Sequence, residues 1–259
     1  TARQLAELMV GSELPQPTTH GDTRRSEVTL ELKDVSIPTA TGSRDLISHI
    51  SFNLHAGEVV GIAGVEGNGQ AELVEAIMGL RKYTGSIDFQ GSSIDDMSVA
   101  HRHDLGIGLI PEDRQRQALM MDSPLWENRI LGHQRGKPVM RGFILDKKAT
   151  IEDTKRIMEE FDVRAPGPMT AAAALSGGNQ QKFIVGREMS KAPALLVASH
   201  PTRGVDVGAQ GAIWEVLREA RTQGMAIVLI SADLEELIGM SDRLLVMLRG
   251  VITAELDPQ

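Results

Sequence analysis

The sequence predicts an α/β fold in which helices wrap a parallel core sheet, together with an N-terminal antiparallel β subdomain and a helical subdomain. Nearly continuous apolar runs at 58–63, 194–198 and 226–230 are typical of strands that are covered on both faces. Segments with helical apolar spacing separate these runs, which favours parallel strands joined by helical crossovers. Alternating apolar and polar residues at 28–35 and 50–54 predict two half-buried antiparallel strands.

The remaining elements follow from the same patterns. We expect a helix over 70–78 that ends at Gly79, short strands over 86–90 and 107–110, and a helix over 147–161. Helices near 209–221 and 234–240 and a buried strand over 243–248 complete the core. Residues from about 115 to 175 lack strand signals and are expected to form the helical subdomain of one domain that covers 26–259. Residues 1–11 have the spacing of a short amphipathic helix, and 13–22 form a polar linker with prolines, so we expect 1–25 to be the tail of a preceding domain.

Composition excludes several classes of function. A net charge of −8 argues against a nucleic-acid binder, which usually carries a basic stripe. The absence of cysteine excludes thiol chemistry and cysteine metal sites, and no metal site is predicted. No apolar run is long enough to span a bilayer, so a membrane role would come through a partner. We expect residues 101–103 on the surface, Asp95 and Asp96 at a helix cap, and Trp126 in the core.

A glycine-rich loop follows the first buried strand and opens a helix, which is the setting of a phosphate-binding loop of the form Gly-x-x-x-x-Gly-Lys-Ser/Thr. Gln70 stands at the lysine position and Ala71 at the position of the magnesium-binding hydroxyl. A neutral amide there loses a charge-assisted contact, about 1.5–3 kcal/mol. Two carboxylates add negative charge where phosphate would lie, so we expect a loop that is stable when empty, with a carboxylate partly in the place of the anion. The candidate residues of this degenerate loop are Gly64, Glu66, Gly67, Asn68, Gly69, Gln70, Ala71 and Glu72.

A second anion-binding motif begins the helix that follows Leu175. A serine at a helix start caps the helix, and glycine exposes backbone N–H groups that attract an anion. Gln180, Gln181 and Lys182 continue this helix, and a solvated helix face and a ligand contact are equally compatible with them. The candidate binding residues here are Ser176, Gly177, Gly178, Asn179 and Gln180.

The order of these motifs resembles an ATP-binding cassette of the ABC transporter family from about residue 27 onward. The runs 175–182 and 201–209 resemble importers of simple sugars, and the degenerate loop is similar to the second cassette of bacterial sugar or nucleoside importers. The resemblance implies that residues 1–25 hold the tail of a first cassette on the same polypeptide. It also implies that ATP and Mg²⁺ bind chiefly at a composite site with that partner cassette, at the cytoplasmic face of the bacterial inner membrane. Further implied partners are a membrane permease, reached through the Glu112 loop and the helical subdomain, and indirectly an extracytoplasmic solute-binding protein, with no nucleic acid.

The resemblance further implies that the catalytic positions are degenerate. Ser199 and His200 stand where the family has Asp and Glu, Ala232 stands at a histidine position, and Glu112 stands at a glutamine position. We therefore expect the domain alone to be inactive or very weak as an ATPase. One alternative is an atypical active ATPase that uses His200, with an unperturbed pKa of about 6.5, as its base. Another is a soluble ABC protein that is not tied to transport.

Overall fold

The computed structural model describes residues 17, 21, 23–39 and 45–258. The helix expected over 1–11 lies outside these residues. The chain forms two compact units, and each is considered by itself. Unit one contains residues 110–192 and 201–213 of the described chain, and unit two contains the rest.

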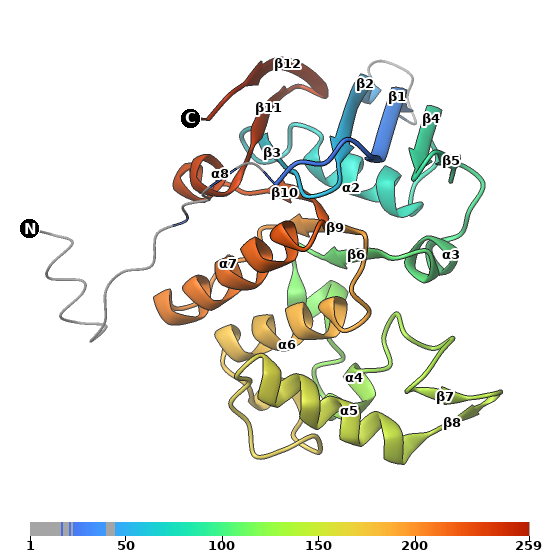
Figure 1. Cartoon of the computed structure of the whole chain (residues 1–259), viewed down its shortest axis with the longest axis vertical. Helices are drawn as coiled ribbons and strands as arrows, with labels where there is room; N and C mark the ends of the chain where they lie inside the picture. Colours follow the sequence, from blue (N-terminus) through green and yellow to red (C-terminus); the bar gives the residue numbers. More distant parts are fainter. Residues whose placement is uncertain (1–16, 18–20, 22, 40–44, 259) are drawn as a thin grey trace, which may run out of the picture. The chain divides into compact units, whose positions relative to one another are not determined.

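Unit two is built on a six-stranded sheet with the order β12-β11-β3-β10-β9-β6. Every residue of β3, β9 and β10 is buried, which explains their continuous apolar sequences and confirms the prediction of strands covered on both faces. β10 pairs in parallel with β3 and β9, β11 pairs in parallel with β3, and β12 runs antiparallel to β11 (Figure 1). The strands are β3 (Val59–Ala63), β6 (Ile107–Ile110), β9 (Leu195–Ser199), β10 (Ala226–Ile230), β11 (Arg243–Leu248) and β12 (Val251–Leu256).

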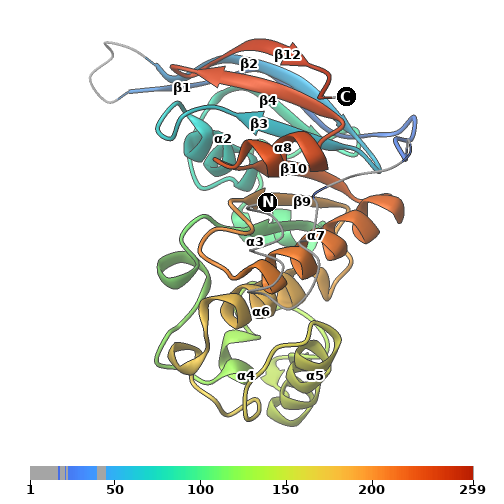
Figure 2. The ribbon, with the colours of Figure 1, turned by 90° about the vertical axis from the view of Figure 1, so that its left-hand side faces the viewer.

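The predicted antiparallel strands form a second, four-stranded sheet with the order β2-β1-β4-β5. Its members are β1 (Val28–Pro38), β2 (Asp45–His55), β4 (Thr84–Phe89) and β5 (Ser92–Ser93). Apolar side chains from this sheet, from the parallel sheet and from α2 (Gln70–Met78) share one core cluster, which includes Leu32, Phe52, Val60, Leu73 and Val228. Figure 2 shows α2 beside β3, so the core holds the helix that follows the phosphate-type loop in place.

The helices of unit two begin and end where local signals predict. α2 ends at Gly79, whose φ of 72° suits glycine and whose N–H donates to Ala76 O. α8 (Leu234–Met240) starts at Asp233, whose carboxylate accepts from the N–H groups of Glu235 and Glu236. α7 (Val207–Thr222), which starts within the 201–213 segment of unit one and ends in unit two, is slightly longer than expected.

Around α3 (Val99–Asp104), the expected helix cap is wrong, and of the residues 101–103 expected on the surface, His101 is exposed but Arg102 is buried. The cap of this helix is Ser98, whereas the Asp95 carboxylate accepts from the Ile87 N–H and the Tyr83 hydroxyl, both at 2.8 Å. Arg102 is only 1% exposed, because its guanidinium donates to the carbonyl oxygens of Ala76 and Ile77 in the last turn of α2, at 2.7 and 2.8 Å. A charged residue flanked by two histidines looked solvated in sequence, and only the fold shows the carbonyls that it satisfies.

Unit one is mainly helical. A compact apolar cluster includes Leu125, Ile157, Phe183 and Ile184, and Trp126 is buried as expected. The helices are the π-helical turn η1 (Arg114–Ala118), α4 (Leu125–Asn128), α5 (Lys147–Glu160), the 3-10 turn η2 (Ala172–Ala174) and α6 (Gly177–Met189). Asp146 caps α5 by accepting from Ala149 N at 3.0 Å.

The segment 115–175, which lacks strand signals in the sequence, also contains two short strands. A hairpin of β7 (Met140–Arg141) and β8 (Ile144–Leu145) projects from the rest of the unit in Figure 1. Strands of two residues are too short to show a periodic pattern, which is why the sequence did not reveal them. In the part of the chain that the structure describes, no helix has the length and apolar character that crossing a membrane requires.

Candidate nucleotide-binding surfaces

The turn between β3 and α2 has the path of a phosphate-binding loop. Gly69, at its end, has a φ of 109°, a left-handed conformation that favours glycine. A Cβ at Gly69 would lie 2.7 Å from the Ile47 and Met247 side chains. Backbone conformation and packing therefore both require glycine where the sequence motif has it.

The Gln70 side chain folds back into this loop and is only 8% exposed. Its Oε1 accepts from the Asn68 N–H at 3.0 Å, and its Nε2 donates to Val65 O at 3.2 Å. We expected a carboxylate of the loop to take part of the place of a bound anion. Instead, the neutral Gln70 amide oxygen accepts the Asn68 N–H, a backbone donor of the kind that binds phosphate in such loops. The Gln70 side chain thus supplies, from within the loop, the hydrogen-bond acceptor that a phosphate oxygen would otherwise provide.

Asn68 ties the same loop to the β11–β12 turn. Its Oδ1 accepts from Arg249 N at 2.7 Å, its main-chain oxygen accepts from Gly250 N at 2.9 Å, and its Nδ2 donates to Val65 O at 2.6 Å. The sequence placed Asn68 in the loop but gave no sign of this connection, because Arg249 is 181 positions away.

These residues do not fit Mg²⁺-ATP at this loop. Gln70 brings no positive charge, and Ala71 has no hydroxyl to bind the metal. The end of β9 presents Ser199, buried, where a magnesium-supporting carboxylate would be needed. Glu72 lies in the first turn of α2, where its charge favours the helix dipole and repels phosphate.

His200 has a structural role at the ends of two strands. Its φ is 50°, its N–H donates to Ile230 O at 2.7 Å, and its Nδ1 accepts from Ala232 N at 3.3 Å. Because Nδ1 accepts this backbone N–H, its lone pair is engaged within the chain. This geometry opposes the use of His200 as a general base.

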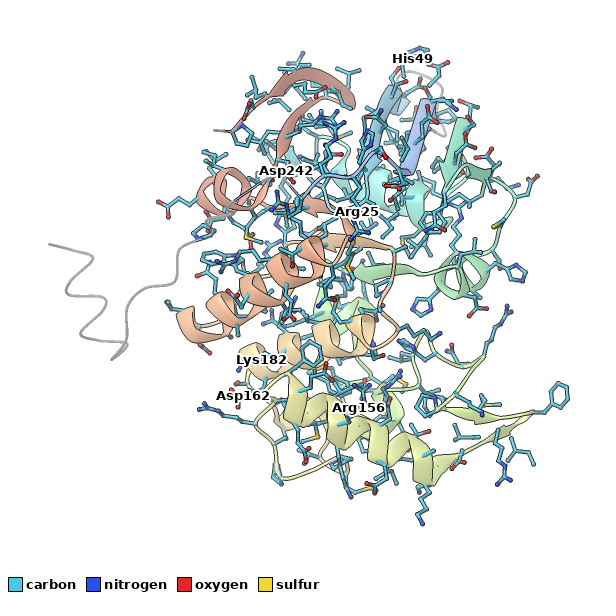
Figure 3. The ribbon with its side chains drawn as sticks, in the orientation of Figure 1. Arg25, His49, Arg156, Asp162, Lys182 and Asp242 are labelled. Carbon is cyan, nitrogen blue, oxygen red and sulfur yellow. The ribbon has the colours of Figure 1, made fainter. Side chains whose placement is uncertain are left out.

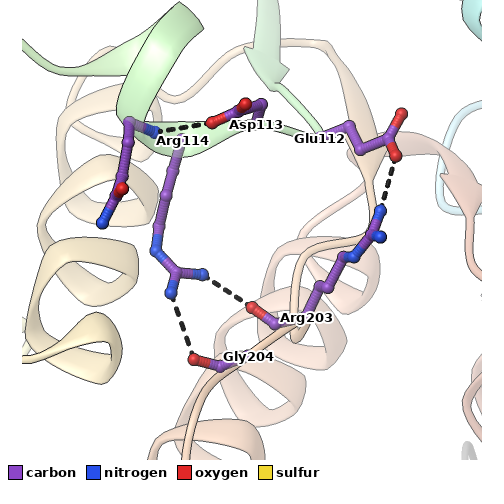
Figure 4. A pocket seen from close by; sticks show the side chains of 6 residues that line it. Glu112, Asp113, Arg114, Arg203 and Gly204 are labelled. Carbon is purple, nitrogen blue, oxygen red and sulfur yellow. Dashed lines mark hydrogen bonds and ion pairs between the residues drawn. The ribbon is translucent and has the colours of Figure 1, made fainter.

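Glu112 lies in a pocket of unit one with a volume of about 430 Å³ (Figure 4). The Glu112 carboxylate pairs with the Arg203 guanidinium at 2.5 Å. Arg114 donates to Arg203 O at 2.6 Å and to Gly204 O at 3.1 Å, and burial lowers the pKa of Arg114. The sequence drew attention to Glu112 but not to either arginine, since nothing local links positions 90 residues apart.

The second motif forms the start of α6 as predicted. Ser176 is exposed and caps the helix by accepting from Asn179 N at 3.4 Å. A Cβ on Gly177 would lie 2.6 Å from Arg114 Nη2, and one on Gly178 would lie 2.9 Å from the Asp206 carboxylate. Both glycines therefore have no room for a side chain, and an exposed serine hydroxyl stands at the N-terminus of a 13-residue helix. Such a surface suits an anion.

The residues that continue α6 do not form a solvated face. Gln180 and Gln181 are 3% and 2% exposed, and the Gln180 amide donates to Ala172 O and Leu175 O. Gln180 therefore holds the preceding turn, and its side chain is not part of the exposed surface. Lys182 pairs with Asp162 at 2.8 Å (Figure 3), and this hydrogen bond lowers the pKa of Asp162.

An α/β core with a glycine loop after β3 and a serine-capped glycine start to α6 defines a nucleotide-binding cassette. The chain belongs to the ABC transporter family, whose sequence pattern, described as "ABC transporter", matches residues 47–203.

Two curated relatives are similar over nearly the whole chain. One is the guanosine import ATP-binding protein NupO of Bacillus subtilis, 40% identical over 99% of this chain and 50% of that protein. Another is the nucleoside import ATP-binding protein NupA of Lactococcus lactis, 40% identical over 100% of this chain and 51% of that protein. The chain thus spans about half the length of these curated relatives.

Solved structures support the fold. A nucleotide-free ATP-binding cassette from an ABC transporter superposes with a TM-score of 0.76 at 22% identity, covering 90% of this chain and 92% of that one. A dimeric post-hydrolysis state of the cassette MJ0796 bound to ADP and phosphate gives 0.76 at 20% identity, covering 89% and 99%.

Proposed function

We propose that this chain is the nucleotide-binding domain of an importer for sugars or nucleosides, and that it completes the ATP site of a partner cassette without hydrolysing ATP at its own loop. The observation that carries the proposal is the contrast between the two motifs. The Gln70 amide hydrogen-bonds within the loop after β3. Ser176 is an exposed residue at the start of α6, whose hydroxyl oxygen accepts from the Asn179 N–H and Nδ2 and whose own O–H remains a donor. The start of α6 would therefore contact the phosphate of an ATP that is bound mainly by the partner cassette.

The relatives support the importer class. NupO and NupA are named as import ATP-binding proteins for guanosine and nucleosides, and this chain matches about half of each. The partner would then be a first cassette on the same polypeptide, with residues 1–25 as its tail and linker and 26–259 as the present domain. The assembly would work at the cytoplasmic membrane face with a permease, reached through Glu112 and the helical subdomain, and with a solute-binding protein.

At the composite site, ATP with Mg²⁺ would supply the phosphates, and the partner's loop would hold them. The contribution of this chain is the Ser176 hydroxyl, together with the main-chain N–H groups at the start of α6, which are positioned before phosphate charge develops. Gly177 and Gly178 allow the start of α6 to pack closely against Arg114 and Asp206, because neither carries a side chain.

The first test is ATP turnover by this chain alone. We expect no Mg²⁺-dependent rate above background, because Ala71 and Ser199 replace the groups that support the metal. A robust rate that His200→Ala abolishes would instead establish the atypical ATPase.

The second test uses the complete two-cassette transporter and separates helix capping from phosphate contact. Ser176→Asp and Ser176→Asn both retain a good helix cap, but only aspartate adds a charge that repels phosphate. We expect Ser176→Asp to abolish ATPase activity and uptake, Ser176→Asn to retain much more of both, and Ala173→Arg, an exposed position of the same unit, to have little effect. Equal activity of the aspartate and asparagine variants would contradict the proposed contact of Ser176 with the partner's ATP phosphate.

A further inference from the structure

The β7–β8 hairpin carries an apolar tip that no part of the described chain covers. The Phe143 side chain is fully exposed at 103%, and Ile144 is exposed at 75%. A large aromatic and a large aliphatic side chain side by side in water are unfavourable for an isolated domain, and exposed apolar clusters of this kind mark interaction sites.

The base of the hairpin is fixed, so the tip has a defined position. Val139 is buried, and its main-chain oxygen accepts from Asp146 N at 2.9 Å. Met140 N donates to Gly136 O at 2.8 Å, and Met140 pairs with Leu145 across the hairpin. The pairing continues to Arg141, which lies opposite Ile144, and Phe143 lies in the turn that joins the two strands.

Cationic residues flank the tip in the sequence, although the chain as a whole has a net charge of −8. The carboxylate of this segment, Asp146, already accepts from Ala149 N as the cap of α5. The Lys147 ammonium group lies 4.6 Å from the centroid of the Trp126 ring. The other cations lie in the sequence on both sides of Phe143, and all are exposed: Arg135, Lys137, Arg141 and Lys148.

We infer that the β7–β8 hairpin inserts its Phe143–Ile144 tip into the surface of a bilayer that contains anionic lipid, with the surrounding cations at the level of the head groups. The charge complementarity is direct, since anionic head groups attract clustered Lys and Arg while an aromatic and an aliphatic side chain enter the boundary with the acyl chains. A convex tip suits a fluid lipid surface, which closes around it without a preformed pocket. The inference goes beyond the proposed function and does not depend on it.

The test is sedimentation of the purified full chain with vesicles. We expect it to bind vesicles of phosphatidylcholine mixed with phosphatidylglycerol, to bind phosphatidylcholine vesicles much less, and to dissociate as salt is added. Phe143→Ser should weaken the partition coefficient about tenfold or more, because burial of a phenylalanine side chain is worth at least one decade of affinity. Arg141→Gln should weaken it and reduce its dependence on salt.

Matched controls separate the tip from general surface properties. Met169→Ser removes another exposed apolar side chain of the same unit, and Lys155→Gln removes an exposed cation of α5. Both should bind as the original chain does. Because the chain contains no cysteine, an environment-sensitive fluorophore on Ile144→Cys reports insertion at one position, with Met169→Cys as its control. We expect a blue shift with anionic vesicles for the first label only.

Each of three vesicle results would overturn the inference: no binding to anionic vesicles, binding that Phe143→Ser leaves unchanged, or equal shifts for both labels. If Phe143→Ser instead converts a dimer to a monomer in sedimentation velocity, a second copy of the chain covers the tip and the lipid assignment is wrong. Unchanged melting temperatures of the variants, expected because the substituted side chains are exposed, show that the fold is intact.

Discussion

Substitution of Gln70 by alanine tests whether its amide holds the loop after β3 in a closed form. The variant removes an acceptor from Asn68 N and a donor to Val65 O, at 3.0 and 3.2 Å. Each neutral hydrogen bond contributes about 0.5–1.5 kcal/mol net. We therefore expect Gln70→Ala to lower the free energy of unfolding by about 1–3 kcal/mol.

Urea denaturation measures this change, with Gln223→Ala as the matched control. Gln223 is an exposed glutamine whose Nε2 donates to Glu219 at 3.2 Å, so its loss should cost less than about 0.5 kcal/mol. Equal destabilisation by the two variants would refute the closed-loop reasoning. Faster exchange of the Asn68 amide hydrogen in Gln70→Ala would support it, because that N–H loses its acceptor.

The same loop gives a test with ligand. The double variant Gln70→Lys, Ala71→Ser restores a cation and a hydroxyl, and a charge-assisted contact is worth about 1.5–3 kcal/mol. Calorimetry should therefore show ATP affinity that rises about tenfold to a hundredfold over the original chain. Tight Mg²⁺-ATP binding by the original chain would contradict the fit argued from Gln70 and Ala71.

Two further predictions concern packing and ionisation. Gly186→Ala should destabilise unit one by about 1–3 kcal/mol, because a Cβ there would lie 2.6 Å from Phe161; Gly136→Ala, with nothing within 4 Å, is the control, and equal melting temperatures would contradict the packing argument. The single tyrosine, Tyr83, should titrate at about 12, because burial and the hydrogen bond to Asp95 raise its pKa. The unfolded chain releases this proton at about 10, so the contribution of Tyr83 to stability is present below pH 10 and is lost as the pH rises toward 12. Ultraviolet titration of tyrosinate checks the value, and a midpoint near 10 would contradict it.

Local sequence determined the elements whose signals lie within a few residues. The β10 and β11 bounds, the start and end of α2, and the serine cap of α6 could all be predicted, because buried strands, glycine ends and caps depend on near neighbours. The degenerate loop was visible for the same reason, since Gln70 and Ala71 stand at defined positions of a contiguous motif.

Tertiary structure alone decided how those residues are used. The ties of Asn68 to Arg249 and of Arg114 to Gly204, and the burial of Arg102, depend on groups that are distant in sequence. The Gln70 amide bonds partners within five positions, but its direction depends on the path of the folded loop. The neighbouring residues in the sequence look the same whether a polar side chain donates to a distant carbonyl oxygen or is exposed to solvent. Sequence therefore fixed which chemical groups were present, and the folded chain decided which of them remain exposed to a ligand.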